Sequence, residues 1–211
     1  LLYKTTILCY AFFQVMKMYV ANINFDEIPE IGFAHQHYSM NYGTKYGINK
    51  KMNVEIAYIN LGAVRLSLYG KEMLAKKGSV IVIFRHLPIF TSTTKEEKNS
   101  HVAVLAEFSN YNFSLLKEDA FCLEGFLIPF VTEPCIDAEK IGKRLYKIAA
   151  DMAENREKNA LSSSVEFLSI LKSLDEIYRK NTPSASRAYT SIKEKVFAFV
   201  EDNCEQKIGL C

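Results

Sequence analysis

This sequence has few of the features that would place a protein outside a reducing, aqueous compartment. Its five cysteines are odd in number and scattered, and none forms a C-x-x-C pair, so a disulfide framework and a structural zinc site are both disfavoured. The longest uncharged run near the start, residues 5–16, is too short to cross a bilayer, and no cleavage site of small residues follows it. We therefore expect a cytoplasmic protein that does not enter a membrane.

An excess of one sign of charge is also lacking, since 26 basic residues face 24 acidic ones. A net charge of +2 over 211 residues does not by itself indicate a nucleic-acid or membrane surface. Apolar residues make up 49% of the chain and charged residues 24%, as in an ordinary globular protein. The length allows one domain, or one domain with an appendage.

From residue 22 to about residue 130 the apolar residues mostly alternate, which is typical of half-buried strands. Gly62, Gly70 and Gly78 interrupt this pattern and are expected in turns. Short strands with glycine turns at close spacing predict a β-barrel or sandwich. Strands are expected at 53–60, 63–69, 79–84 and 101–108, with 79–84 buried on both faces and a polar loop at 91–100.

After Pro129 and Pro134 the period changes to that of amphipathic helices. The first helix carries the stripe Ile141, Leu145, Ile148 and Met152. Residues 159–164 are expected to break it, and a capping box at 163–166 is expected to open a second helix. The stripe of that second helix comprises Phe167, Ile170, Leu171, Leu174, Ile177 and Tyr178. A short connection predicts that the two helices pair antiparallel.

The most informative polar pattern is His35-Gln36-His37, followed by Glu55 and then Gly62. Two histidines two residues apart on a strand point to the same side, where a carboxylate on a neighbouring strand can meet them. Such a cluster is typical of a small β-barrel whose mouth holds a ligand or a metal ion.

The order of these segments resembles that of AraC-type (AraC/XylS) transcriptional regulators. His35-Gln-His37 and Glu55-Ile-Ala-Tyr58-Ile-Asn-Leu-Gly62 resemble the opening of the family's cupin-like sensor domain. Residues 70–83 resemble the stretch that follows, with Ser79 in place of the usual Asp. Residues 189–210 resemble the first helix of the family's DNA-binding domain.

The resemblance implies an α+β fold, a cupin-like antiparallel β-barrel (double-stranded β-helix) followed by an antiparallel α-helix pair. It implies an apolar N-terminal extension or arm at 1–21, an effector-binding barrel at 22–133 and a helical dimerisation segment at 134–181. A linker would follow at 182–190, and the first helix of a truncated helix-turn-helix domain at 191–211. The chain would then be the effector-sensing and dimerisation portion of a transcription regulator that contacts DNA only through a missing C-terminal domain.

On this interpretation the barrel binds a small polar effector, with a sugar as one candidate, and the protein is neither an enzyme nor a cofactor carrier. The candidate ligand-binding residues are His35, His37, Tyr38, Glu55, Arg65 and His86. Each has a structural alternative, a histidine bonded to backbone at a strand end or, for Arg65, a solvated rim residue.

The same donors permit a second hypothesis, a metal-dependent cupin oxygenase or isomerase. Imidazole and carboxylate groups suit iron, manganese, nickel or zinc, and His35, His37 and Glu55 would be the ligands. However, the stretch between His37 and Glu55 is long for that class, and neither His86 nor His101 stands where a fourth ligand is expected. A third hypothesis is a carbohydrate-binding cupin with no regulatory role.

Two apolar helix stripes offer more surface than one small barrel face needs. The surplus predicts a two-fold homodimer through the helix pair. The candidate dimerisation residues are Ile141, Leu145, Ile148, Met152, Leu171 and Leu174.

Overall fold

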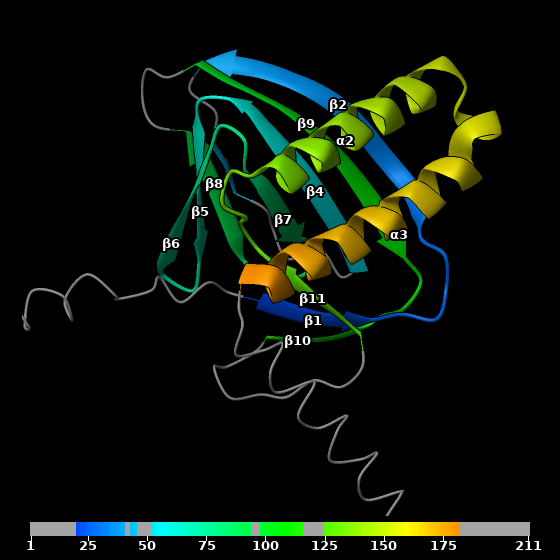
Figure 1. Ribbon diagram of the computed structural model, residues 1–211, viewed down its shortest axis with the longest axis horizontal. Helices are drawn as coiled ribbons and strands as arrows, with labels where there is room; N and C mark the ends of the chain where they lie inside the picture. Colours follow the sequence, from blue (N-terminus) through cyan, green and yellow to red (C-terminus); the bar gives the residue numbers. More distant parts are fainter. Residues whose placement is uncertain (1–19, 41–42, 46–51, 94–97, 116–124, 182–211) are drawn as a thin grey trace, which may run out of the picture.

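A computed structural model describes residues 20–40, 43–45, 52–93, 98–115 and 125–181 (Figure 1). Within these residues the chain forms eleven strands followed by two helices, an α+β arrangement. The strands are β1 (Val20–Asn24), β2 (Glu30–Met40), β3 (Gly43–Lys45), β4 (Met52–Leu61), β5 (Ala63–Leu68), β6 (Lys71–Lys76), β7 (Val80–Phe84), β8 (Ile89–Thr93), β9 (Lys98–Phe108), β10 (Asn112–Leu115) and β11 (Phe126–Pro129). The helices are α2 (Ile136–Glu154) and α3 (Arg156–Asn181).

The strands pair antiparallel and form three sheets. Two of them have four strands, in the orders β2-β9-β4-β7 and β3-β8-β5-β6, and the third has the order β10-β1-β11. The two four-stranded sheets face each other, because one cavity is lined from both of them. The antiparallel β domain is thus confirmed, whereas a fully closed barrel stays a prediction.

The expected glycine turns are present. Gly62, Gly70 and Gly78 all have positive φ angles, of 74°, 75° and 90°. Gly62 also lies against the backbone carbonyl of Lys98, where a side chain would collide. Because a left-handed conformation and a close backbone approach both favour glycine, this turn needs that residue between β4 and β5.

Strand β4 separates two environments, since successive side chains point to opposite faces. Glu55 and Ala57 point into the space between the sheets. Tyr58 points the other way and packs under Gly142 of α2. Strand β7 beside it is buried along its whole length, as its continuous apolar sequence predicts.

Helix α2 lies across the outer face of the β2-β9-β4-β7 sheet, and α3 returns beside it towards β11 (Figure 1). Cys135 caps the start of α2, where its Sγ accepts a hydrogen bond from the Ala138 N–H at 3.4 Å. The expected antiparallel pairing is confirmed, because Asp137 near the start of α2 contacts Lys180 near the end of α3.

The expected break at 159–164 is wrong. The helices are separated by Asn155 alone, which is extended, with φ −157° and ψ 97°. Its side chain accepts a hydrogen bond from the Lys158 N–H at 3.0 Å, as an N-cap does, and so opens α3. The serines of the expected break lie inside α3, where Ser162 donates to the carbonyl of Asn159. Ser162 is tolerated there because its hydroxyl finds a partner within the helix.

The loop expected at 91–100 is wrong at both ends. Residues 91–93 belong to β8 and residues 98–100 to β9. Thr91 and Thr93 alternate with exposed residues and are buried, so their polarity did not exclude a strand. Threonine is β-branched and fits a pleated sheet.

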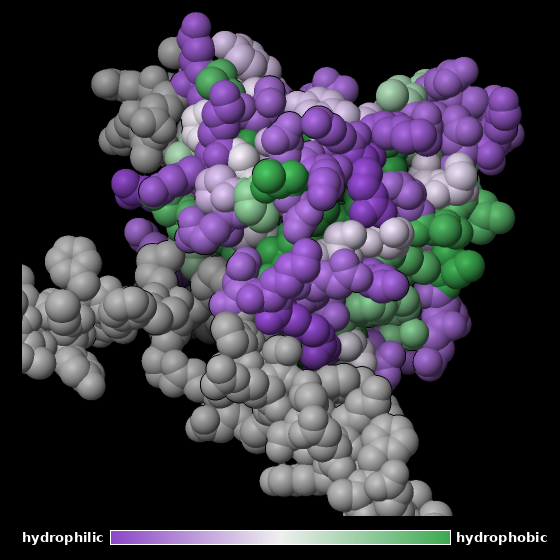
Figure 2. Space-filling model, viewed as in Figure 1, coloured by the Kyte–Doolittle hydropathy of each residue, from purple (hydrophilic) through white to green (hydrophobic). Residues whose placement is uncertain are grey.

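The apolar helix stripes predicted for dimerisation pack against the rest of the same chain. Five of the six side chains are buried and Met152 is partly buried; the five are Ile141, Leu145, Ile148, Leu171 and Leu174. The surplus apolar surface lies elsewhere, since Leu161 and Val165 of α3 are 67% and 51% exposed. On the face drawn in Figure 2, apolar residues gather on the right-hand side around α3 and the segment between β1 and β2. A dimer therefore stays a prediction, and these exposed residues are candidates for its interface.

The arm predicted at 1–21 overlaps β1 at residues 20 and 21, and its remainder lies outside the described residues. The linker at 182–190 and the helix at 191–211 also lie outside them. Neither described helix combines the length and apolar character that a membrane crossing requires.

Candidate ligand-binding site

Three histidines lie together on the inner face of the β2-β9-β4-β7 sheet. His35 and His37 point to the same side of β2, as predicted, and His37 pairs across the sheet with His101 of β9. The ring centroids of His37 and His101 are 5.0 Å apart, and those of His35 and His101 are 5.6 Å apart. Phe33 continues the row, with its ring 4.6 Å from that of His35.

A partly buried ion pair lies on the same face. Glu55 of β4 is 4% exposed and accepts a hydrogen bond from the Arg85 guanidinium, which follows the end of β7. Burial raises the pKa of Glu55, and the charge and hydrogen bond of Arg85 oppose that rise. A buried carboxylate of this kind is stable only with such a partner.

The predicted meeting of Glu55 with the His35–His37 pair is wrong in one respect. Strand β9 lies between β2 and β4, so the carboxylate is two strands away from these histidines. Its neighbour on β9 is Leu105, and the residue beside His35 on β9 is Ala103. The polar groups therefore share one face, with small or apolar residues between them.

The pKa values of two of these histidines, His35 and His101, are lowered, which favours the neutral imidazole. Burial, followed by the charges of His37 and His35, lowers the pKa of His101 to about 4. Burial and His37 also lower the pKa of His35, with a smaller effect of Arg85. The His101 ring is fixed by a 2.9 Å hydrogen bond between its Nδ1 and Oδ1 of Asn99. A neutral imidazole presents one donor and one acceptor, so it can bind an uncharged polar group.

A small cavity lies between the two four-stranded sheets, with free space of about 10 Å³, close to what one water molecule needs. A ligand larger than water must therefore widen this cavity as it binds. Its lining combines three polar residues, Glu55, Thr91 and His101, with the apolar residues Ala57, Val64, Ile81 and Ile83. The lining residues come from β4, β5, β7, β8 and β9.

Several buried polar atoms lack a hydrogen-bond partner among the described residues, and two of them belong to this region. They are Oγ1 of Thr91, in the cavity wall, and Nδ1 of His35. Nearly all buried polar groups in proteins have a partner, and leaving one unsatisfied costs about 1–3 kcal/mol. The Thr91 hydroxyl is therefore a group that a polar ligand or a water molecule would satisfy.

Three of the predicted ligand-binding residues do not join this site. Tyr38 is 62% exposed and points to the opposite side of β2 from its neighbour His37. Arg65 is exposed and points away from Val64, which lines the cavity. His86 lies in an aromatic cluster with Phe84 and Phe113, where its Nδ1 is hydrogen-bonded to the Tyr111 hydroxyl at 2.7 Å.

The donor set for a metal ion is not assembled in the part of the chain that the structure describes. No group of three or more His, Cys, Asp or Glu side chains there has an arrangement that would hold an ion. His35 and His37 are close, but Glu55 is paired with Arg85 across the interposed strand.

Sequence reasoning overlooked Thr91 and gave His101 only a doubtful role as a metal ligand. A signal for Thr91 exists in the alternation of Ile89, Thr91 and Thr93, which is the period of a strand with one buried face. The position of His101 opposite His37 depends on the pairing of two strands about sixty residues apart, which local periodicity does not specify.

No family model matches this chain, and no curated protein matches it. Among solved structures, an apo variant of ToxT from Vibrio cholerae shows 13% identity over 90% of this chain and 67% of its own, with a TM-score of 0.40. The cupin domain of Cnp3 from Schizosaccharomyces pombe shows 16% identity over 42% and 64%, with a TM-score of 0.29. The polyketide cyclase RemF from Streptomyces resistomycificus shows 18% identity over 49% and 75%, also with a TM-score of 0.29. Likenesses this weak establish neither a family nor a function.

Proposed function

We propose that this protein is the sensing part of a ligand-responsive transcription regulator of the AraC type, built on a cupin-like barrel. A small polar molecule binds between the two four-stranded sheets. The helix pair that covers the barrel carries the state of the cavity to a DNA-binding domain outside the described residues. The protein binds its effector and does not transform it.

The observation that supports this proposal is the unsatisfied hydroxyl of Thr91 in a cavity that also exposes Glu55 and His101. These three side chains offer acceptors and donors, while Ala57, Val64, Ile81 and Ile83 supply apolar walls. A few convergent polar groups in an otherwise apolar cavity are typical of small-molecule sites.

The electrostatics favour an uncharged occupant. The carboxylate of Glu55 is already neutralised by Arg85, and His101 stays neutral because burial lowers its pKa to about 4. An ion entering this cavity would lose its hydration without meeting a free opposite charge. Hydroxyl groups, as in a sugar or polyol, would instead exchange hydrogen bonds with water for bonds to Thr91 and His101.

The experiment is a calorimetric titration with pentoses, hexoses, small polyols and short carboxylates. We expect at least one neutral compound to bind, and Thr91→Val to weaken that binding about tenfold, because one hydrogen bond is lost at nearly constant volume. Arg65→Gln, on the outer face of β5, is the control and should leave the affinity unchanged. The absence of binding across the whole panel, or equal binding by Thr91→Val, would refute the proposed site.

The regulatory role is tested separately in the full-length protein. DNA binding should change when the bound compound is added, and the Thr91→Val variant should need about ten times more of it. A compound that binds the cavity without changing DNA affinity would leave a plain binding module.

A further inference from the structure

Strand β4 links the cavity to the helices, because its side chains point alternately into the cavity and towards α2. Ala57 lines the cavity, and the next residue, Tyr58, lies on the face that α2 covers. A displacement of β4 at Ala57 therefore moves Tyr58 with it, since the two share one rigid stretch of backbone. Ala57 pairs with Ala103 of β9 and Ile81 of β7, which fixes this stretch within its sheet.

Tyr58 is in unusually close contact with α2. A Cβ atom added at Gly142 would come within 2.6 Å of the Tyr58 ring, so the absence of a side chain there lets the helix rest directly on the aromatic face. Glu139, Lys143 and Tyr146 of α2 surround the phenol closely enough to influence its pKa, which burial raises. With no free space between ring and helix, α2 must follow the ring or lose the contact.

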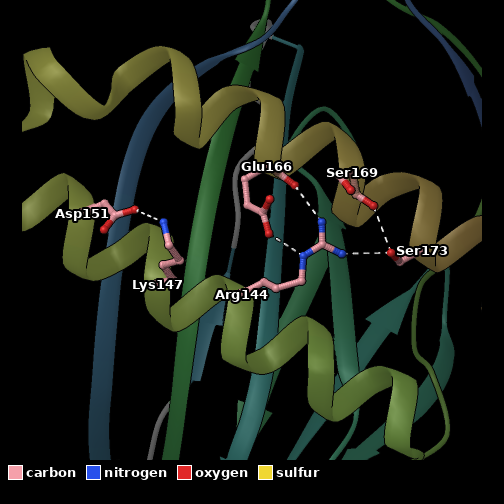
Figure 3. A network of polar contacts seen from close by, with 6 residues as sticks. All are labelled: Arg144, Lys147, Asp151, Glu166, Ser169 and Ser173. Atoms are coloured by element: carbon pink, nitrogen blue, oxygen red, sulfur yellow. Dashed lines mark hydrogen bonds and ion pairs between the residues drawn. The ribbon is translucent and has the colours of Figure 1, made fainter.

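Two residues after Gly142, Arg144 joins α2 to α3 (Figure 3). Its Nε donates to Oε1 of Glu166 at 2.5 Å, and its Nη1 donates to the Ser173 hydroxyl at 3.0 Å. Ser173 in turn donates to the carbonyl of Ser169 at 3.0 Å. One guanidinium thus binds α3 at two sites separated by about two turns.

We propose that Ala57, Tyr58, Gly142 and Arg144 form a mechanical link through which filling of the cavity shifts α2 and changes its attachment to α3. The inference rests on the proposed ligand site, because it describes how occupancy of that site is transmitted. It assigns Tyr58 and Arg144 as positioning residues that touch no ligand.

The test needs no ligand. Ala57→Val adds volume on the cavity side of β4, and Arg144→Gln removes the ionic attachment to α3. Urea unfolding of the whole protein gives the equilibrium constant for each single variant and for the double variant. For distant and independent substitutions, the product of the two single effects predicts the equilibrium constant of the double variant to within about twofold. For Ala57→Val and Arg144→Gln we expect the double variant to differ from that product by at least about threefold, and this difference is the discrepancy. Backbone amides at 166–173 should also exchange hydrogen at least about threefold faster in Ala57→Val.

Three controls isolate the link. Lys147 lies on the same helix and forms its ion pair with Asp151 of α2, with only a weaker charge interaction with Glu166 of α3, so Lys147→Gln should combine additively with Ala57→Val. Val64→Ile fills the same cavity from β5, as a ligand would, and should also combine non-additively with Arg144→Gln. In a Tyr58→Leu background, the discrepancy between Ala57→Val and Arg144→Gln should fall to within about twofold. If Ala57→Val fails to fold, Ala57→Gly tests the same link with the opposite change in volume.

Additivity of the Ala57 and Arg144 substitutions in the parent protein would overturn the inference, and so would a discrepancy that persists in Tyr58→Leu. A failed calorimetric titration would refute the ligand site and leave this coupling result unaffected. The two failures are therefore distinguishable.

Discussion

Burial shifts the pKa values of Glu55 and His101 in opposite directions. It raises the pKa of the Glu55 carboxyl and lowers that of the His101 imidazole to about 4, because in each case it disfavours the charged form. Both groups are also tied to a neighbour, Glu55 to Arg85 and His101 to Asn99. Arg85 offsets part of the effect of burial on Glu55, whereas Asn99 fixes the orientation of the His101 ring.

The stability of the protein should fall between about pH 6.5 and about pH 4 through His101. The unfolded chain takes up a proton near pH 6.5, whereas folded His101 takes one up only near pH 4. The unfolded state binds more protons in that window, so stability rises with pH there, by at most about 1.4 kcal/mol per pH unit for one proton. Urea midpoints measured from pH 4 to pH 7 should show this slope, and His101→Gln should reduce it.

Glu55 provides the opposing control. Its raised pKa makes the folded state bind more protons above pH 4.5, so its own contribution to stability falls as pH rises through that window. Glu55→Gln should steepen the fall in stability on acidification. A slope unchanged by His101→Gln would show that His101 is not held neutral.

Among the elements, α2 depends on a glycine in an unusual way. Replacing glycine by alanine inside a helix normally stabilises it by up to about 1 kcal/mol. At Gly142 the new methyl group would meet the Tyr58 ring at 2.6 Å. The ring belongs to a packed sheet and has little room to move aside.

We therefore expect Gly142→Ala to lower the free energy of unfolding by about 1–3 kcal/mol, because overpacking exceeds the gain in helix propensity. Urea unfolding followed by circular dichroism measures this change. The double variant Gly142→Ala with Tyr58→Ala, compared with Tyr58→Ala alone, should recover the ordinary stabilising effect. A stabilised single variant would show that the helix does not rest on this ring.

The sequence predicted the kind of each element better than its ends. The strand around β4 and the stripe of α2 were found because alternate and helical spacings are local properties of the chain. The break between the helices was misplaced because the 163–166 capping pattern competes with Asn155, and only the folded packing decides between them. At the site, His35 and His37 were placed by local spacing, whereas the insertion of β9 between β2 and β4 follows from long-range topology.

For the whole molecule, the buried helix stripes and the exposed residues of α3 make different predictions about assembly. Leu145 and Leu171 are fully buried and hold the helices to the body of the protein. Leu161 and Val165 leave more than half of their surface in solvent. Exposed apolar residues of this kind are the ones available to a second copy.

If the protein is a dimer, sedimentation velocity should show that the double variant Leu161→Glu with Val165→Glu is a folded monomer, with stability within about 0.5 kcal/mol of the parent monomer. Leu145→Glu should instead unfold the protein or cost about 4 kcal/mol or more, because it buries an unpaired charge. A dimer that survives both α3 substitutions would place the interface elsewhere.

The third sheet carries a consequence for redesign of the chain. Strand β1 is its middle strand, hydrogen-bonded to β10 on one side and to β11 on the other, although both of these strands follow it far along the chain, from residues 112 and 126. In a shortened version beginning at residue 25, β10 and β11 would both lose the strand to which they are hydrogen-bonded. Because α3 packs against β11, the loss of β1 would also destabilise the packing of α3, the last helix of the described chain. Removal of the N-terminal strand would thus weaken the C-terminal part of the described chain.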